Sequence, residues 1–309
     1  MSAPYPWLAE PFAKIRQDAE SGRLAHAILI AGAVGSGAFE LAKEIAAYRL
    51  CQSPGEKACG NCKACQLLDA GSHPDLRLLE PEGAAKSIRV DQIRSLTGFI
   101  AQTPQIGNWK LVVIQMADRM NQNAANALLK MLEEPSGNCL IMLATERPQL
   151  LLPTVRSRCS HIRIKTPSIA QSVTYLVERG MAQEQADQLV GQVGARPILI
   201  QDWLEQDILP QWQTSMEKLQ ALDAGQTSPM TVASELASMD FPLLVSWAMQ
   251  FVAGRSRLLA FKDRARSCAY LELFERLQDC RRELDAGTNP NPQLALESLF
   301  LQWQTLVQR

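Results

Sequence analysis

A short apolar run, a glycine-rich turn and a helical pattern follow one another near the beginning of the chain, and this order constrains the fold most. Residues 27–31 read Ala-Ile-Leu-Ile-Ala, residues 32–37 contain three glycines, and residues 39–50 have helical periodicity. A continuous apolar run of this kind is typical of a parallel strand buried on both faces. The sequence therefore predicts a strand, a tight turn and a helix in the arrangement of a phosphate-binding loop.

Further apolar runs alternate with helical patterns up to residue 166. This alternation predicts a doubly wound α/β domain with a parallel sheet over residues 1–166. After Pro167 the strand signals end, and we expect a small helical unit over 167–206 and long amphipathic helices over 207–309. The other expected strands are 75–79, 110–116, 139–144 and 161–164, and the other expected helices of the first domain are 7–24, 87–100 and 121–134.

The bulk composition limits the classes of partner. A chain of 309 residues is long enough for two or three domains. Its formal net charge is -1, so it has no overall basic field to hold nucleic acid, and any DNA contact must be local or shared with partner chains. Because neither a secretory signal nor an apolar run near the roughly 20 residues of a membrane span is evident, we expect a soluble, cytoplasmic protein without membrane contact.

The glycine-rich turn has the frame of a phosphate loop but lacks its functional side chains. Gly32, Gly35 and Gly37 permit the tight turn that directs backbone N–H groups at an anion. The lysine that would neutralise the outer phosphates is replaced by Ala38, and the hydroxyl residue that would hold Mg²⁺ is replaced by Phe39. By itself this turn could equally be a plain connection between a strand and a helix.

A second substituted motif favours a phosphate-loop fold that has lost hydrolysis. In an active ATPase of this kind the strand over residues 111–114 ends in two acidic residues, which bind the metal and polarise the attacking water. Here these positions are Gln115 and Met116, which can do neither. We therefore expect neither ATP in this site nor ATPase activity from the chain by itself.

Four of the eight cysteines lie within fifteen residues and predict a structural metal site. Cys51, Cys59, Cys62 and Cys65 are separated by seven, two and two residues. Four thiolates without an open coordination position are typical of structural Zn²⁺, here in a module over about residues 51–72. A thioredoxin-like redox pair is the alternative. His73 is a possible substitute ligand, although a role in a solvated loop is the simpler expectation for it.

Two later blocks carry a resemblance to a known family. Residues 126–135 read Asn-Ala-Leu-Leu-Lys-Met-Leu-Glu-Glu-Pro, and residues 152–159 read Leu-Pro-Thr-Val-Arg-Ser-Arg-Cys. Both blocks, and His26 before the glycine-rich turn, are similar to the AAA+ subunits of bacterial DNA polymerase III clamp loaders, in the same order and separation. The resemblance covers residues 1–165 and implies an AAA+ domain, with a lid domain at 167–206 and an all-α collar domain for oligomerisation at 207–309.

The resemblance also assigns roles to individual residues. It makes Arg158 an arginine finger, offered with Ser157 and Cys159 as its motif to ATP held by an adjacent subunit, and Cys159 itself a small buried residue. The cysteine cluster is placed where bacterial clamp-loader subunits carry zinc. Thr145 and Arg196 occupy positions similar to two nucleotide-sensing positions, and we interpret them as structural, since no nucleotide is expected here.

The implied function is that of an assembly subunit without its own hydrolysis. The resemblance implies a hetero-oligomer with gamma/tau motor subunits and a delta subunit, acting on the sliding clamp and primed DNA within a DNA-directed DNA polymerase (nucleotidyltransferase) holoenzyme. One alternative is an active ATPase motor subunit of the same family, against which Ala38 and Gln115 argue. Another is a zinc-dependent nucleic-acid-binding module, against which the acidic charge balance argues.

Overall fold

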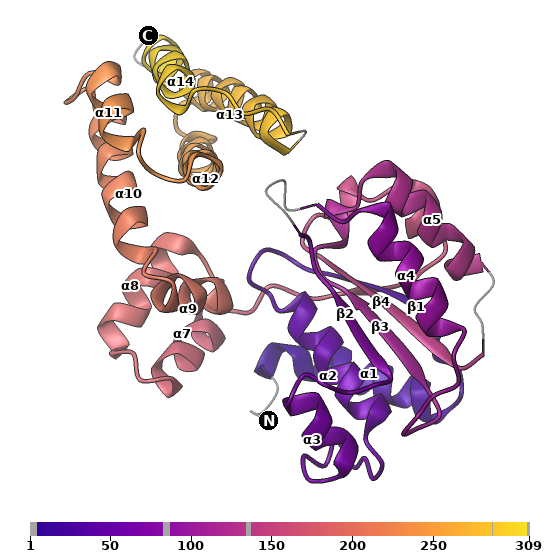
Figure 1. The fold of residues 1–309 in the computed structure, drawn as a ribbon. Coiled ribbons are helices and arrows are strands. Elements are labelled where there is room, and N and C mark those ends of the chain that lie inside the picture. Colours follow the sequence, from indigo (N-terminus) through magenta and orange to yellow (C-terminus); the bar gives the residue numbers. More distant parts are fainter. Residues whose placement is uncertain (1–4, 83–86, 134–136, 286, 308–309) are drawn as a thin grey trace. The chain divides into compact units, whose positions relative to one another are not determined.

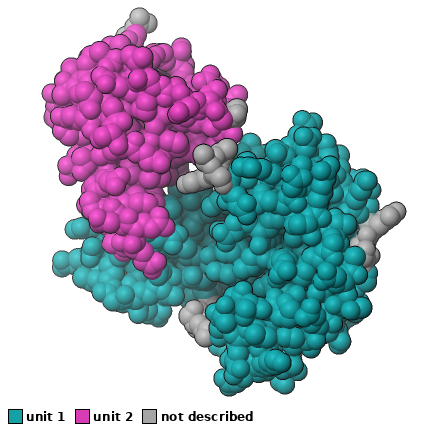
Figure 2. All heavy atoms as spheres, in the orientation of Figure 1, with its two compact units in different colours: residues 1–202 teal, residues 203–309 magenta. Residues whose placement is uncertain are grey.

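The computed structural model describes residues 5–82, 87–133, 137–285 and 287–307. It divides into two compact units, Met1–Asp202 and Trp203–Arg309 (Figure 2). The division between them lies close to the predicted end of the lid domain at residue 206. The predicted boundary between residues 166 and 167 falls inside the first unit and stays a prediction. The last two residues of the block at 126–135 lie outside the described residues.

The first unit is built on a five-stranded parallel sheet, as the alternating pattern predicted. The strand order is β2-β3-β4-β1-β5, and every neighbouring pair is parallel. The strands are β1 Ala27–Ala31, β2 Leu76–Leu79, β3 Lys110–Ile114, β4 Cys139–Thr145 and β5 Ser160–Arg163. Every residue of β3 and β4 is buried, which explains why these strands are largely apolar rather than alternating, with Lys110 and Thr145 as the polar residues at their ends.

Helices cover both faces of this sheet (Figure 1). On one face α2 packs against β1 and β4, and on the other α4 and α5 pack against each other, with α4 against β3. Leu29, Val112 and Ile141 join the buried cluster on the α4–α5 face. The helical elements of this part are η1 Pro6–Leu8, α1 Ala9–Glu20, α2 Ala38–Leu50, α3 Lys63–Asp69, α4 Val90–Ile100, η2 Ala117–Arg119, α5 Gln122–Glu133, η3 Pro148–Leu150 and α6 Pro153–Arg156.

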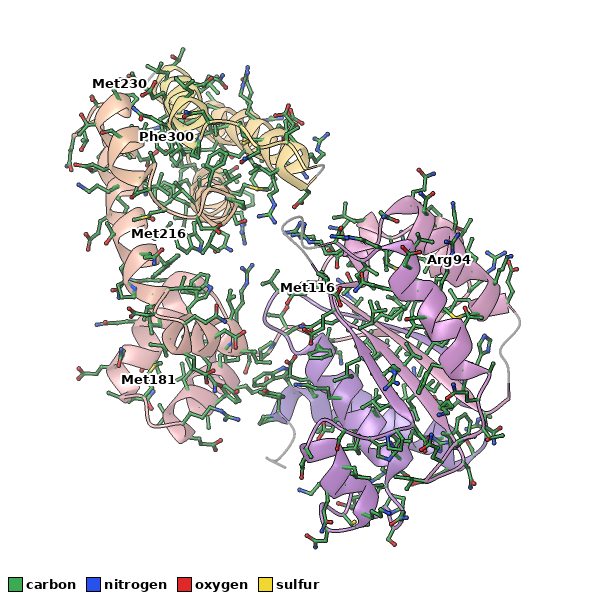
Figure 3. The ribbon with its side chains drawn as sticks, viewed as in Figure 1. Arg94, Met116, Met181, Met216, Met230 and Phe300 are labelled. Carbon is green, nitrogen blue, oxygen red and sulfur yellow. The ribbon has the colours of Figure 1, made fainter. Side chains whose placement is uncertain are left out.

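Several expected boundaries were wrong. The helix expected over residues 7–24 ends at Glu20, before the turn at Gly22. Two other differences have a clear physical reason. The helix expected from residue 87 begins at Val90, because Ser87 and Ile88 first form isolated β-bridges to Glu82 and Met120. The strand expected over 110–116 ends at Ile114, because Met116 has left-handed backbone angles that no strand can contain. Figure 3 labels Met116 beyond the end of β3, where its side chain is half exposed.

The rest of the chain is helical, as expected from the loss of strand signals after Pro167. Among the described residues, no helix is both long and apolar enough to cross a membrane. The first unit also contains α7 Ile169–Glu178, α8 Gln183–Val193 and most of α9 Pro197–Glu205, and the second contains α10 Leu209–Asp223, α11 Pro229–Leu236, α12 Phe241–Leu259, α13 Arg264–Asp285 and α14 Pro292–Val307.

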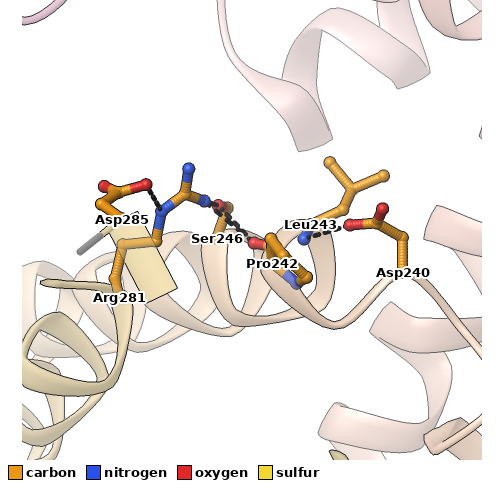
Figure 4. Close-up of polar contacts among 6 residues, drawn as sticks. All are labelled: Asp240, Pro242, Leu243, Ser246, Arg281 and Asp285. Carbon is orange, nitrogen blue, oxygen red and sulfur yellow. Dashed lines mark hydrogen bonds and ion pairs between the residues drawn. The ribbon is translucent and has the colours of Figure 1, made fainter. Parts of the chain in front are cut away.

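Polar contacts set the packing of the second unit. The Asp240 carboxylate accepts a hydrogen bond from the Leu243 N–H and so caps α12. Arg281 of α13 donates to the Pro242 carbonyl and to the Ser246 hydroxyl, and these bonds tie α13 to the first turn of α12 (Figure 4). The Asp223 carboxylate at the end of α10 is buried. It accepts hydrogen bonds from side chains of α13 and α14 and forms an ion pair with a side chain of α12, so four helices meet at this one carboxylate.

Candidate functional site

The glycine-rich turn that follows β1 is packed over by the chain's own side chains. The Trp7 indole N–H donates to the Ser36 carbonyl at 2.8 Å, so η1 is bound directly to the loop. A Cβ placed on Gly35 would lie 2.7 Å from the Leu199 Cβ of α9, which shows how closely α9 approaches the loop. The Gly35 N–H, which a phosphate would use, donates instead to the Glu146 carboxylate at 2.9 Å. The loop therefore has the backbone shape of an anion site and contains a carboxylate of the same chain.

The two substituted positions after the loop add no phosphate or metal ligand. Gly37 begins α2 with φ +92°, so the left-handed turn of a phosphate loop is retained. Ala38 is buried and uncharged. Phe39 carries its ring where a hydroxyl would be needed, and the Lys43 ammonium lies 4.7 Å from the centre of that ring.

Neither of the two residues directly after β3 is an acid or a base. Gln115 and Met116 follow this strand directly, and the Gln115 N–H still extends the sheet by donating to the Leu79 carbonyl. The Thr145 hydroxyl at the end of β4 is buried and donates to the Asp118 carboxylate at 2.6 Å, while it accepts the Arg147 N–H at 3.0 Å. These contacts join the end of β4 to η2, and the structural role expected for Thr145 stays a prediction.

The Ser-Arg-Cys block forms the turn between α6 and β5. Its backbone continues the turn of α6, with the Arg158 N–H donating to the Val155 carbonyl. Cys159 points into the core, where burial raises the pKa of its thiol to about 11. The Ser157 hydroxyl donates to the Thr154 carbonyl at 3.1 Å on the exposed side. The structure thus confirms that Cys159 is a packing residue and leaves Arg158 at the surface.

The Arg158 guanidinium is partly exposed and held by two neighbours. Its Nε donates to Oε1 of Glu133 at 2.7 Å, and Nη2 lies 2.5 Å from the same oxygen. Its Nη1 donates to the Thr154 carbonyl at 3.0 Å. These contacts engage three of the five N–H groups of an arginine. Nothing in the sequence pattern predicted that Glu133, the last residue of α5, would contact this arginine.

The four clustered cysteines meet at one point in space. Cys51 ends α2, Cys62 and Cys65 come from the start of α3, and Cys59 lies on the intervening loop. All four sulfur atoms lie within 4.8 Å of one another, with Cys51 and Cys62 sulfurs 3.9 Å apart and Cys59 and Cys65 sulfurs 4.0 Å apart. Four sulfurs bound tetrahedrally at about 2.3 Å are about 3.8 Å apart. The cluster therefore fits one tetrahedral metal ion.

The sulfur distances bear on the redox alternative only in part. The closest sulfur pairs are far beyond the roughly 2.05 Å of a disulfide bond, a spacing that suits both a metal site and a reduced thiol pair. His73 is not part of the cluster. The expectation that His73 lies in a solvated loop was wrong, because it is buried and its Nδ1 accepts the Asp75 N–H at 3.1 Å.

Comparison with known proteins agrees with these features. A family model described as "DNA polymerase III, delta subunit" matches residues 8–168. The curated DNA polymerase III subunit delta' of Pseudomonas aeruginosa is 36% identical over 98% of each chain. The chain belongs to the DNA polymerase III delta' family. The delta' subunit of Escherichia coli K12 is 40% identical over 56% of this chain and 52% of that protein. A solved gamma-subunit-related protein from Thermotoga maritima aligns over 97% of this chain and 99% of its own, with 21% identity and a TM-score of 0.49.

Membership of this family confirms the resemblance drawn from residues 126–135 and 152–159. Sequence reasoning found the substituted loop, the cysteine cluster and the exposed arginine of the delta' chain. It missed the side chains that pack over the loop, namely Trp7, Glu146 and Leu199, which lie in three separate parts of the sequence. It also missed Glu133 as the partner of Arg158.

Proposed function

We propose that this delta' chain serves a clamp loader as a subunit that does not hydrolyse ATP and that presents Arg158 to nucleotide held by a neighbouring motor subunit. In this role it assembles with gamma/tau and delta subunits and supports loading of the sliding clamp onto primed DNA. The proposal joins two features of one domain, a nucleotide loop covered by its own chain and an exposed arginine in a family block.

The observation that carries the proposal is the placement of these features on the sheet. The loop follows β1, whereas Arg158 precedes β5, and these two strands are parallel neighbours. The two features therefore lie at opposite ends of these strands. The four residues of β5 separate them, which is about 13 Å at roughly 3.3 Å per residue. Arg158 and the chain's own loop thus lie at opposite ends of neighbouring strands, and in this proposal the phosphate partner of Arg158 comes from another chain.

The chemistry of the side chain suits this role. A guanidinium is always charged and its planar fork binds two phosphate oxygens at once. Arginine fingers in other phosphoryl-transfer systems contribute roughly 10³–10⁵ in rate by stabilising charge that develops in the transition state. The Ser157 and Cys159 side chains hold the turn, while Arg158 reaches solvent.

The test uses complexes reconstituted with wild-type or Arg158→Ala chain at equal assembly. We expect the variant to fold and assemble, since replacing one partly exposed arginine rarely changes stability much. The complex should lose the DNA-stimulated ATP turnover of the one site that this chain abuts, and clamp loading should fall with it. Unchanged turnover and loading would leave Arg158 as a structural arginine and the chain as a scaffold.

We also propose that the four-cysteine cluster binds one structural Zn²⁺. The loop over residues 52–58 between Cys51 and Cys59 has no buried side chain to hold it, so a metal would supply the missing stability. Metal analysis of chain purified without chelator should give about one zinc per chain. Chelation should increase proteolysis within residues 51–65, whereas a chain that contains no metal and resists proteolysis there would refute the site.

A further inference from the structure

We propose that Glu133 is a positioning residue for Arg158: its carboxylate holds one edge of the guanidinium so that the opposite edge faces the phosphate of a neighbouring chain. This inference rests on the proposed trans role of Arg158. It adds a second residue to that role, from a different helix. It also predicts the sign of the effect: Glu133 assists the arginine rather than restrains it.

The donor geometry leaves the required edge open. Nε and Nη2 both reach one oxygen of Glu133, so the carboxylate occupies the side edge of the planar group. Nη1 gives one N–H to the Thr154 carbonyl. Within the described part of the chain, one N–H on each terminal nitrogen then has no acceptor, and these two N–H groups are left to donate to phosphate oxygens.

The two anchors are themselves held rigidly. Glu133 is the last residue of α5, and Thr154 lies in the first turn of α6. The two helices pack against each other, and Leu132 and Val155, next in sequence to the anchors, belong to the same buried cluster. The guanidinium is thus fixed from two elements of the core and not from a mobile surface chain.

Pre-orientation explains how an exposed ion pair can assist a reaction. An unrestrained arginine side chain loses about 2 kcal/mol of rotamer entropy when it is immobilised. Here part of that loss has already occurred before nucleotide arrives. Because the side chains are 36% and 48% exposed, solvent screens the pair, and its effect must be modest. About 1 kcal/mol is the upper end for exposed pairs, which corresponds to roughly a 5-fold change in rate.

The experiment compares Glu133→Ala with Arg158→Ala in reconstituted clamp-loader complexes at equal assembly. The ATP turnover lost in the Arg158→Ala complex is the part of the total rate that depends on Arg158, and this part is the component to be measured. Glu133→Ala should lower kcat of that component about 3- to 5-fold with little change in KM for ATP, since the finger acts on transition-state charge. Glu133→Gln retains the oxygen that accepts from Nε and should retain more of the rate.

Two controls separate positioning from general damage. Glu10→Ala removes another exposed ion pair of the same unit, the one with Lys165, and should leave turnover unchanged. In an Arg158→Ala background, Glu133→Ala should have no further effect. Loss of turnover in that background, or no loss from Glu133→Ala alone, would overturn the positioning role.

The remaining outcomes are equally decisive. A gain in turnover on Glu133→Ala would show that the carboxylate restrains the arginine and would refute the inference while retaining the finger. If Arg158→Ala itself has no effect, the proposed function fails first, and no role of Glu133 in turnover remains. The two failures are therefore distinguishable from the same set of complexes.

Discussion

One domain contains two motifs that differ in exposure. The glycine-rich loop over residues 32–37 is covered by its own chain, whereas the Ser-Arg-Cys block over residues 157–159 has its arginine at the surface. Both adjoin the same pair of neighbouring strands, β1 and β5. The loop kept its backbone shape but is covered by Trp7 and Leu199, and its N–H group at Gly35 is satisfied internally. The block kept its charged residue at the surface, with an edge of the guanidinium open.

Under the proposed function, the difference is that of a nucleotide site that has lost its chemistry while its fold persists. A phosphate loop works only if its N–H groups and cation are left for ligand, so internal contacts that satisfy or cover them remove the function without disturbing the sheet. A residue that acts on another chain needs only exposure and orientation. The following predictions test this contrast, from the largest expected effect to the smallest.

The largest effect concerns the fork of Arg158. Arg158→Lys retains the charge but not the two-pronged donor geometry, so it should lower ATP turnover at the neighbouring site by roughly 10³-fold, close to the loss in Arg158→Ala. Turnover is measured in the reconstituted complex, with assembly checked by size. A lysine variant that works nearly as well as wild type would show that this block supplies charge alone, and the contrast with the loop would weaken.

A stability change is expected where the loop meets α9. Gly35→Ala puts a Cβ 2.7 Å from the Leu199 Cβ at a backbone φ of +73°, so overpacking and strain act together. The free energy of unfolding should fall by about 2–4 kcal/mol in denaturant titration. Gly22→Ala is the matched control, because it shares a left-handed φ of +70° while a Cβ there meets nothing within 4 Å, so it should show the strain alone and a smaller loss. Equal effects would mean that the loop is not closed by α9.

A smaller stability change separates the two neighbours of Arg158. Cys159→Ser introduces a hydroxyl into the buried cluster and should cost about 1–3 kcal/mol of unfolding free energy. Ser157→Ala removes one exposed hydrogen bond and should change it by less than about 0.5 kcal/mol. Neither variant should abolish turnover in the complex once it is folded. Loss of turnover in folded Ser157→Ala would extend the functional group beyond the arginine.

No gain of function is expected from restoring the four substituted positions. The combined variant Ala38→Lys, Phe39→Thr, Gln115→Asp and Met116→Glu replaces the missing phosphate, metal and water ligands. We expect the isolated chain to remain without ATP turnover, because Trp7, Leu199 and the Glu146 carboxylate still occupy the loop. Steady-state turnover, abolished again by removing the new lysine, would show that the four substitutions alone silenced the site.

Periodicity predicted the core elements well because burial dictates side-chain type along a strand. The runs that became β1, β3 and β4 are apolar except for Lys110 at the start of β3 and Thr145 at the end of β4, since parallel strands are covered on both faces. The predicted ends of strands and helices were less accurate where the backbone conformation changed without a change in hydrophobicity. Met116 is apolar and lies two residues beyond the run, but it has φ +48°, a conformation that no hydrophobicity pattern reveals.

The candidate functional residues were likewise predictable only in part. The chemistry-bearing residue types were visible in the chain: the absent lysine at Ala38, the four cysteines with metal-ligand spacing, and Arg158 within a family block. Their partners were not visible, because contacts such as Arg158 with Glu133, 25 residues apart, depend on how α5 packs against α6. Ion-pair partners at such separations have no period or spacing that would mark them.

The sequence by itself determined the parallel sheet, the absence of phosphate and metal ligands at Ala38 and Phe39, and the four cysteines that form one cluster, because each depends on residue type and local spacing. Only the tertiary structure decided that η1 and α9 cover the loop and that Glu146 accepts the hydrogen bond of the loop's Gly35 N–H. It also decided that Arg158 lies at the opposite end of the strands from the loop. The physical reason is that these are contacts between segments distant in sequence, and their existence follows from strand order and helix packing rather than from the identity of any one residue.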